Sequence, residues 1–209
     1  MNYIDLKSVE SKAWRETFSD GLWDMALGLF MLALMTQKVL VHYPLSDGLR
    51  MSIFVGLELV AIFSVTAGKI VFTIPRIGQV KFGAKRGTGL VKVALVAAAA
   101  IMIGAGLWKV MESSQDQVLI IKRAMPVVWA AAAMVTFGLS AFLLEYRRLY
   151  FIGFLYALTV PTLRFLETLY SPVTAALLAF GVPALIILIM GEMAFVSFLR
   201  STPVPMEET

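Results

Sequence analysis

The chain of 209 residues carries a formal net charge of +4, and 59% of its residues are hydrophobic while only 15% are charged. A soluble domain is typically about 25% charged, so this composition argues against one and leaves little length for a domain outside a membrane. The absence of cysteine excludes disulfides, thiol catalysis and thiolate metal sites. We interpret the positive charge through membrane topology and expect no nucleic-acid partner.

Residues 1–20 are predicted to form a cytoplasmic segment that contains a short amphipathic helix. The stretch from 5 to 18 (DLKSVESKAWRETF) is polar, but its apolar side chains recur with a spacing that suits a helix lying on the inner membrane surface. The first twenty residues are mixed in charge and lack the basic-then-apolar pattern of a signal peptide. We therefore expect no cleavable leader in this segment.

Six apolar segments follow, and a helix of about 20 apolar residues is enough to cross a bilayer. Residues 124–144 and 168–191 are free of any charge, and few soluble helices are apolar on every face. The sequence therefore predicts an all-α, polytopic integral membrane protein, with a six-helix transmembrane domain over residues 21–199 and a cytoplasmic tail over residues 200–209. The spans are predicted at residues 21–42, 50–74, 89–111, 125–144, 149–170 and 173–199.

The distribution of lysine and arginine predicts the orientation. If the N-terminus is inside, 12 of the 18 basic residues fall on the inner side and 5 on the outer side, with one inside the fifth span. Because positive residues favour the cytoplasmic side, we expect a multi-pass protein of the cell membrane with both termini in the cytoplasm. The loop between the second and third spans is expected to contact anionic lipid headgroups through Arg76, Lys81, Lys85 and Arg86.

Two charges are predicted to lie inside the hydrocarbon at similar depths. At about 1.5 Å per residue, Glu58 falls roughly 12 Å from the outer end of the second span and Arg164 roughly 9 Å from that of the fifth. A guanidinium can hold a carboxylate through two hydrogen bonds, so we expect these two to form a pair that Glu167 shares. The pair is either a structural ion pair or part of a site for a small anionic solute or ion.

Pro161 and Pro183 lie near the middle of the fifth and sixth spans. Each removes one helical hydrogen bond and frees the carbonyl four residues earlier, which belongs to Ala157 or Ala179. Transporters present such backbone oxygens to a substrate, although prolines also occur in membrane helices as simple kinks. With the two charges at matching depth, these carbonyls complete the predicted substrate-binding set.

A second group of charges is predicted near the inner side of the membrane. Two acids and two bases at similar depth there can neutralise one another: Asp24, Lys69, Lys92 and Glu192. The expected partner of Glu192 is one of the two lysines. Glu58 and Lys69 are eleven residues apart and share one face of their helix, so we expect that face to turn toward the bundle. With a single histidine and no catalytic or metal-binding constellation, we predict no catalytic site, metal or cofactor.

These observations favour a small carrier, channel or transporter subunit with a polar site in mid-membrane. In size, expected span number and termini, the chain resembles the substrate-binding subunits of energy-coupling vitamin transporters, without a shared motif. The alternatives are a structural or regulatory membrane protein that binds lipid or a partner and, with less support, an intramembrane enzyme acting on lipid. The expected partners are the bilayer and its anionic headgroups, a small anionic solute, and a second copy or another membrane subunit.

The first prediction concerns topology. Reporter fusions after His42 and Gln115 should report the outer side, and fusions after Gly87 and Thr209 the cytoplasm, because of the 12-to-5 asymmetry of basic residues. A fusion after Gly87 that reports the outer side would overturn this topology.

Overall fold

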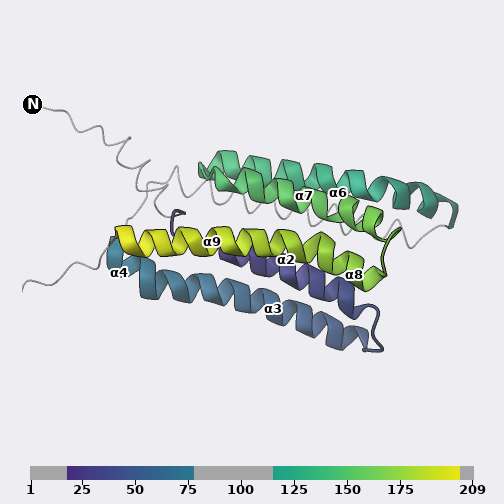
Figure 1. Ribbon diagram of the computed structural model, residues 1–209, viewed down its shortest axis with the longest axis horizontal. Helices are drawn as coiled ribbons and strands as arrows, with labels where there is room; N and C mark the ends of the chain where they lie inside the picture. The colour runs from purple at the N-terminus through teal and green to yellow at the C-terminus, as the bar shows by residue number, and fades with distance from the viewer. Residues whose placement is uncertain (1–17, 78–114, 203–209) are drawn as a thin grey trace, which may run out of the picture. The chain divides into compact units, whose positions relative to one another are not determined.

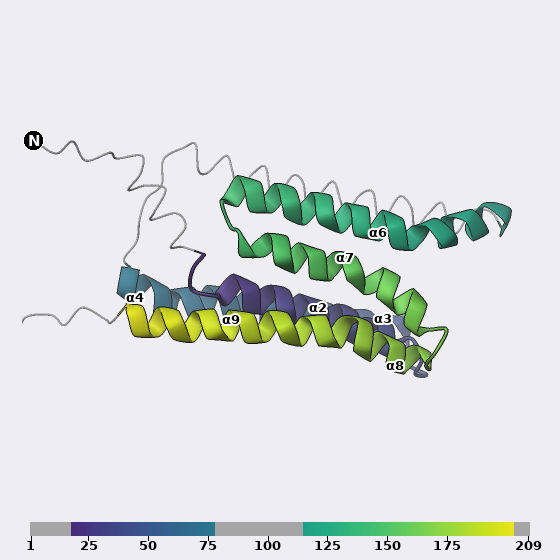
Figure 2. The same ribbon diagram turned by 45° about the horizontal axis from the view of Figure 1, so that its top comes forward.

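The computed structural model describes residues 18–77 and 115–202, which form helices and the short connections between them. Figure 1 labels these helices, and Figure 2 shows them turned by 45°. Five helical segments are long and apolar enough to cross a membrane: Leu22–Leu40, Asp47–Arg76, Ala124–Leu144, Arg148–Leu166 and Pro172–Ser201. They correspond to the first, second, fourth, fifth and sixth predicted spans. The predicted third span and the predicted amphipathic helix lie outside the described residues.

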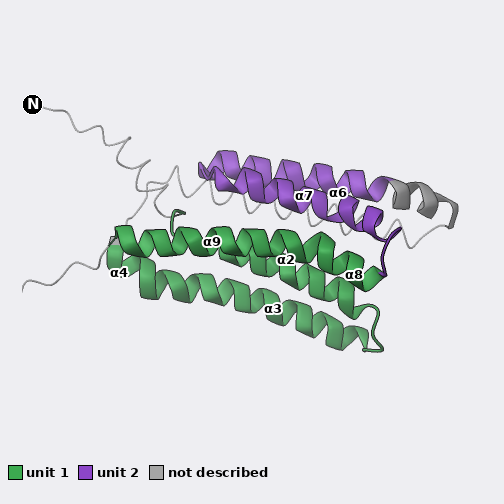
Figure 3. Cartoon of the chain, in the orientation of Figure 1, with its two compact units in different colours: residues 1–82, 172–209 green, residues 83–171 purple. Residues whose placement is uncertain are grey.

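The chain divides into two compact units, residues 1–82 with 172–209 and residues 83–171 (Figure 3). The described part of the first unit contains α2 (Leu22–Leu40), α3 (Asp47–Gly68), η1 (Lys69–Thr73), α4 (Ile74–Ile77), α8 (Pro172–Ala176), η2 (Leu177–Gly181) and α9 (Val182–Ser201). That of the second contains α6 (Gln115–Leu144) and α7 (Arg148–Leu166).

In the first unit α2 packs along α9 through glycines. A Cβ at Gly28 would lie 2.7 Å from Leu188, and one at Gly191 would lie 2.8 Å from the backbone nitrogen of Met25. At both positions the helices are therefore closer than any side chain would allow. Because the contacts run from Met25 and Gly191 to Gly28 and Leu188, residue numbers rise along α2 as they fall along α9, and the two helices are antiparallel. Small residues of this kind let helix backbones approach closely where the surrounding lipid does not drive association.

The opposite flank of α2 packs on α3 in the same antiparallel sense. A Cβ at Gly68 would lie 2.9 Å from Leu22, and Ala61 and Val65 are buried on the same stripe of α3. The remaining surface of α3 and η1 is exposed although it is apolar, through Leu59, Val60, Ile62, Phe63, Ile70 and Val71. Such a long exposed apolar surface is unsuited to water, and it is what a lipid-facing helix presents.

Two π-helical turns interrupt otherwise continuous helices, and each ends two residues before a proline. η1 precedes Pro75 and η2 precedes Pro183. A proline has no N–H, and its ring clashes with the carbonyl four residues earlier, which here belongs to Val71 or Ala179 in the middle of the π turn. The wider turn relieves this conflict. The expected break at Pro183 is therefore a π turn in a continuous helix, and the helix that was expected to end at residue 74 continues to Ile77.

In the second unit α6 and α7 form a closely packed pair. Gly153 of α7 faces Phe137 of α6 with no room for a Cβ, and the rings of Phe137 and Tyr156 lie 4.7 Å apart. α6 begins at Gln115, before the predicted fourth span, but its membrane-capable part, Ala124–Leu144, agrees with the predicted residues 125–144. α7 ends at Leu166, four residues before the predicted end of the span.

The second prediction tests the glycine contacts. Gly191→Ala should lower the free energy of unfolding in detergent by about 1–3 kcal/mol, as overpacking of a close contact typically does. The matched control is Gly56→Ala in α3, where a Cβ meets nothing within 4 Å; it should be neutral or stabilising by up to about 1 kcal/mol. Equal melting temperatures for the two variants would contradict the close packing of α2 on α9.

Candidate functional site

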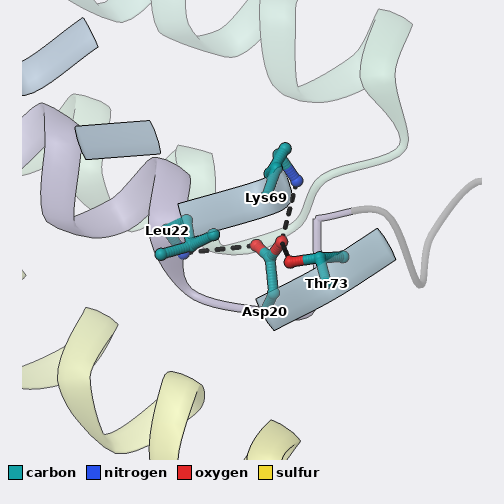
Figure 4. Close-up of polar contacts among 4 residues, drawn as sticks. All are labelled: Asp20, Leu22, Lys69 and Thr73. Atoms are coloured by element: carbon teal, nitrogen blue, oxygen red, sulfur yellow. Dashed lines mark hydrogen bonds and ion pairs between the residues drawn. The ribbon is translucent and has the colours of Figure 1, made fainter. Parts of the chain in front are cut away.

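A buried carboxylate lies at the start of α2 (Figure 4). Asp20 is fully buried. Its Oδ2 accepts hydrogen bonds from Lys69 Nζ and Thr73 Oγ1, each at 2.8 Å, and its Oδ1 accepts one from the Leu22 backbone N–H at 3.2 Å. The charge and both oxygens of this carboxylate therefore have partners within the unit.

Local structure explains how this site forms. Gly21 has a φ of 72° and lies directly against the Gly191 carbonyl of α9, a conformation and a contact that only glycine accommodates readily. The tight turn places Asp20 below the first turn of α2, where free N–H groups and the helix dipole favour an anion. Lys69 and Thr73 are the first and last residues of η1, so the π turn presents both side chains to the same carboxylate.

The ion pair lies deeper than the basic residues at the helix ends. Phe72 of η1 and Phe195 of α9 meet edge to face, 5.4 Å apart, so these helices run side by side at this level. Arg76 follows Lys69 by seven residues, or about 10 Å along the helix. If Arg76 marks the membrane surface, the pair lies within the hydrocarbon, where a charge must be neutralised by a partner. We interpret it as a clasp that joins the start of α2 to η1.

Three of the four residues of the predicted inner cluster belong to the described part of the chain. Lys69 pairs with Asp20, which had been assigned to the N-terminal segment; an Asp just before an apolar run is a typical helix-start signal that could have identified it. Asp24 is fully buried beside Gly191. Glu192 is exposed and has no hydrogen bond or ion pair among the described residues. Lys92 lies outside them.

Arg164 forms an ion pair with Glu167 at 3.1 Å, as their spacing of three residues predicts. Because α7 ends at Leu166, Arg164 lies in its last turn and its side chain is 53% exposed. Arg164 is thus two residues from the end of α7, and its depth in a bilayer stays a prediction. Glu58 belongs to the other unit, so its pairing with Arg164 stays a prediction.

Glu58 lies on the side of α3 that was expected to face the bundle. It precedes the buried Ala61 by nearly one turn, on the stripe that packs against α2. It is half-buried, and within the ranges that the structure covers it has no hydrogen bond or ion pair. Glu58 therefore differs from Asp20, whose carboxylate has three donors.

The level of Glu58 along the unit follows from the packing of α2. Leu22 contacts Gly68 on one flank, and Met35 approaches Gly181 on the other, with its Sδ 3.1 Å from where a Cβ would be. Counting ten residues from the first contact along the antiparallel helices places Glu58 opposite Leu32. This level is within one turn of the contact between Met35 and Gly181 of η2.

The two alanines of the predicted substrate-binding set are buried. Ala179 lies in η2, which packs on α2, and Ala157 follows Gly153 by four residues on the side of α7 that meets α6. Close to Ala157, the Tyr156 carbonyl accepts hydrogen bonds from Trp129 Nε1 at 2.8 Å and Thr159 Oγ1 at 2.7 Å. Sequence reasoning missed this network, which ties α6 to α7 one turn before Pro161.

Of the four residues predicted to contact headgroups, the structure describes only Arg76. It lies at the end of α4 and donates to the Phe72 carbonyl at 2.9 Å; Lys81, Lys85 and Arg86 lie outside the described residues. Within residues 18–77 and 115–202, no group of three or more His, Asp or Glu side chains could hold a metal ion.

Five long apolar helices, close glycine contacts and a buried ion pair indicate a helical membrane protein. In comparisons with known proteins, no family model, no curated protein and no solved structure matches this chain.

The third prediction tests the Asp20 clasp. Asp20→Asn and Lys69→Gln should each lower the free energy of unfolding, the second by about 3–5 kcal/mol because it leaves the fully buried Asp20 carboxylate without its cation. The double variant should recover part of the loss.

The matched control is Asp47→Asn, which removes an exposed ion pair with Arg50 and should leave the melting temperature unchanged. Losses that add in the double variant would show that Asp20 and Lys69 are not coupled.

Proposed function

We propose that this chain is a six-span membrane protein that acts as a carrier, channel or transporter subunit with a polar site at mid-membrane. The observation that carries the proposal is Glu58, a half-buried carboxylate in an apolar helix with no ion pair among the described residues. A charge near the bilayer centre costs at least about 2.5–3.5 kcal/mol. Asp20 offsets such a cost with a lysine, whereas Glu58 leaves it uncompensated within the described residues. An uncompensated polar group of this kind is typical of a functional site.

The packing of the first unit supports the proposed orientation. The start of α2 and the ends of α4 and α9 lie at one end of this unit, as the Asp20–Lys69 and Phe72–Phe195 contacts require. In the proposed topology these ends lead to the N-terminus, the basic loop and the C-terminal tail, which all belong to the cytoplasmic side of the cell membrane. The basic loop would then meet anionic headgroups.

Arg164 determines the class of solute that we propose. The guanidinium is half-exposed in the last turn of α7, so it is accessible to a carboxylate or phosphate group that it can bind through two hydrogen bonds. A small anionic solute is the ligand class that this residue favours. The carbonyls of Ala157 and Ala179 remain part of the proposed site as backbone acceptors beside the two prolines.

A structural or regulatory role is the second candidate. It is favoured by the fully satisfied Asp20 carboxylate, which shows that at least one buried charge in this protein serves to hold helices together. In that case lipid or a partner subunit would be the ligand.

The fourth prediction separates these two functions. In purified protein, Glu58→Gln should leave the melting temperature equal or higher, because it removes an uncompensated charge. A panel of acetate, succinate, citrate and inorganic phosphate should contain an anion that raises the melting temperature of the unmodified protein. Glu58→Gln should change the size of that rise, and Arg164→Gln should abolish it.

Arg147→Gln is the matched control, because Arg147 is an exposed cation at the other end of α7; it should keep the rise. If no anion shifts the melting temperature and Glu58→Gln is clearly destabilising, the structural role replaces the carrier.

A further inference from the structure

The outer surface of α9 carries a charge that the proposed function does not use. Glu192 directly follows Gly191, whose close contact with Met25 fixes this part of α9 against α2. The Glu192 side chain is exposed on another side of the helix. Arg200 is the next charged residue along α9, and it is eight residues away, or about 12 Å along the helix axis.

An open groove of about 640 Å³ runs along this surface. It is lined by Ile189, Glu192, Met193, Val196, Ser197, Arg200 and Ser201. The apolar members lie around and beyond Glu192, and Met193 is 69% exposed. The polar members Ser197, Arg200 and Ser201 belong to the last turns of α9. The groove therefore has a carboxylate in an apolar setting at one end and a polar mouth at the other.

We propose that this groove binds a lipophilic organic cation, with its positive charge at Glu192 and its apolar body along Ile189, Met193 and Val196. An exposed carboxylate among apolar side chains has to be compensated, and a positive charge at van der Waals distance does this most effectively where water is scarce. Organic cations with large apolar groups partition into membranes and can reach such a surface from the lipid. Their soft, irregular shapes suit a flexible thioether such as that of Met193.

The charge pattern favours this occupant over an anionic phospholipid. Arg200 and the two serines could hold a phosphate at the mouth, but the acyl chain of that lipid would then lie over the Glu192 carboxylate and leave it uncompensated. A cation at Glu192 removes this cost and keeps its own charge two helical turns away from the guanidinium of Arg200. The proposed ligand is therefore cationic, and it is independent of the anion expected at Arg164.

The fifth prediction uses two probes of nearly equal size and shape but opposite charge. In equilibrium dialysis with purified protein in detergent, and with empty micelles subtracted, tetraphenylphosphonium should bind saturably while tetraphenylborate should not. Glu192→Gln should weaken tetraphenylphosphonium binding at least about tenfold, because it removes the attraction of an opposite charge at a surface where water is scarce. The matched control is Glu145→Gln, an exposed glutamate in the turn between α6 and α7, which should bind like the unmodified protein.

A second variant keeps the test valid if Glu192→Gln does not fold. Val196→Trp should fill the groove and weaken binding of the bulky cation without changing the charge. Equal binding of the two probes, unchanged binding in both variants, or no binding by the unmodified protein would each overturn the proposal. The last result would show that another segment, a partner or a second copy covers the groove.

Discussion

The close approach of α2 to its neighbours is the constraint on which the first unit depends. In lipid, apolar side chains gain little by leaving their surroundings, so helices associate only where their surfaces fit. Here the fit relies on positions where the side chain is a hydrogen atom, namely Gly28 and Gly191 where α2 meets α9, and Gly68 where α2 meets α3. These contacts fix the level of each helix, and only at that level does Asp20 reach Lys69 and Thr73.

The charges inside the helices fall into two kinds. Asp20 is neutralised by Lys69, and Arg164 by Glu167 at the exposed end of α7. Glu58 and Glu192 have no such partner among the described residues. A protein that needs charges only for packing would pair them, as it does at Asp20. The two glutamates, one facing the bundle and one on the outer surface of α9, are therefore the positions where a compensating group from outside the described residues is expected.

Length and hydropathy predicted the helices well, because spanning a bilayer imposes both on each segment. The described structure has all five of the predicted spans that fall within it. Helix ends were predicted less well, as at the fifth span, because apolar residues continue beyond Leu166 although the helix α7 ends there. The face of α3 that bears Glu58 followed from helical periodicity. Helical periodicity could not predict the partner of Lys69. Asp20 is brought into the unit by the turn at Gly21, and this turn depends on a contact with Gly191 of α9, which lies 170 residues further along the chain.

Helical periodicity also did not predict the two π turns, η1 and η2. These turns determine where a residue can be lost from a helix without changing its contacts. A π turn holds one more residue than an α-helical turn needs, so every side chain after it is rotated by about 100° from where an uninterrupted helix would place it. Loss of one residue within η2 would turn it into an ordinary α-helical turn and leave Gly191 at the same place against α2. Loss of one residue between η2 and Gly191 would instead put Glu192 in the position of Gly191, where the helices leave no room for a side chain. Natural variants of this protein should therefore tolerate a single-residue deletion within η2 better than one between Pro183 and Gly191, and the distance in sequence between these two residues should stay constant.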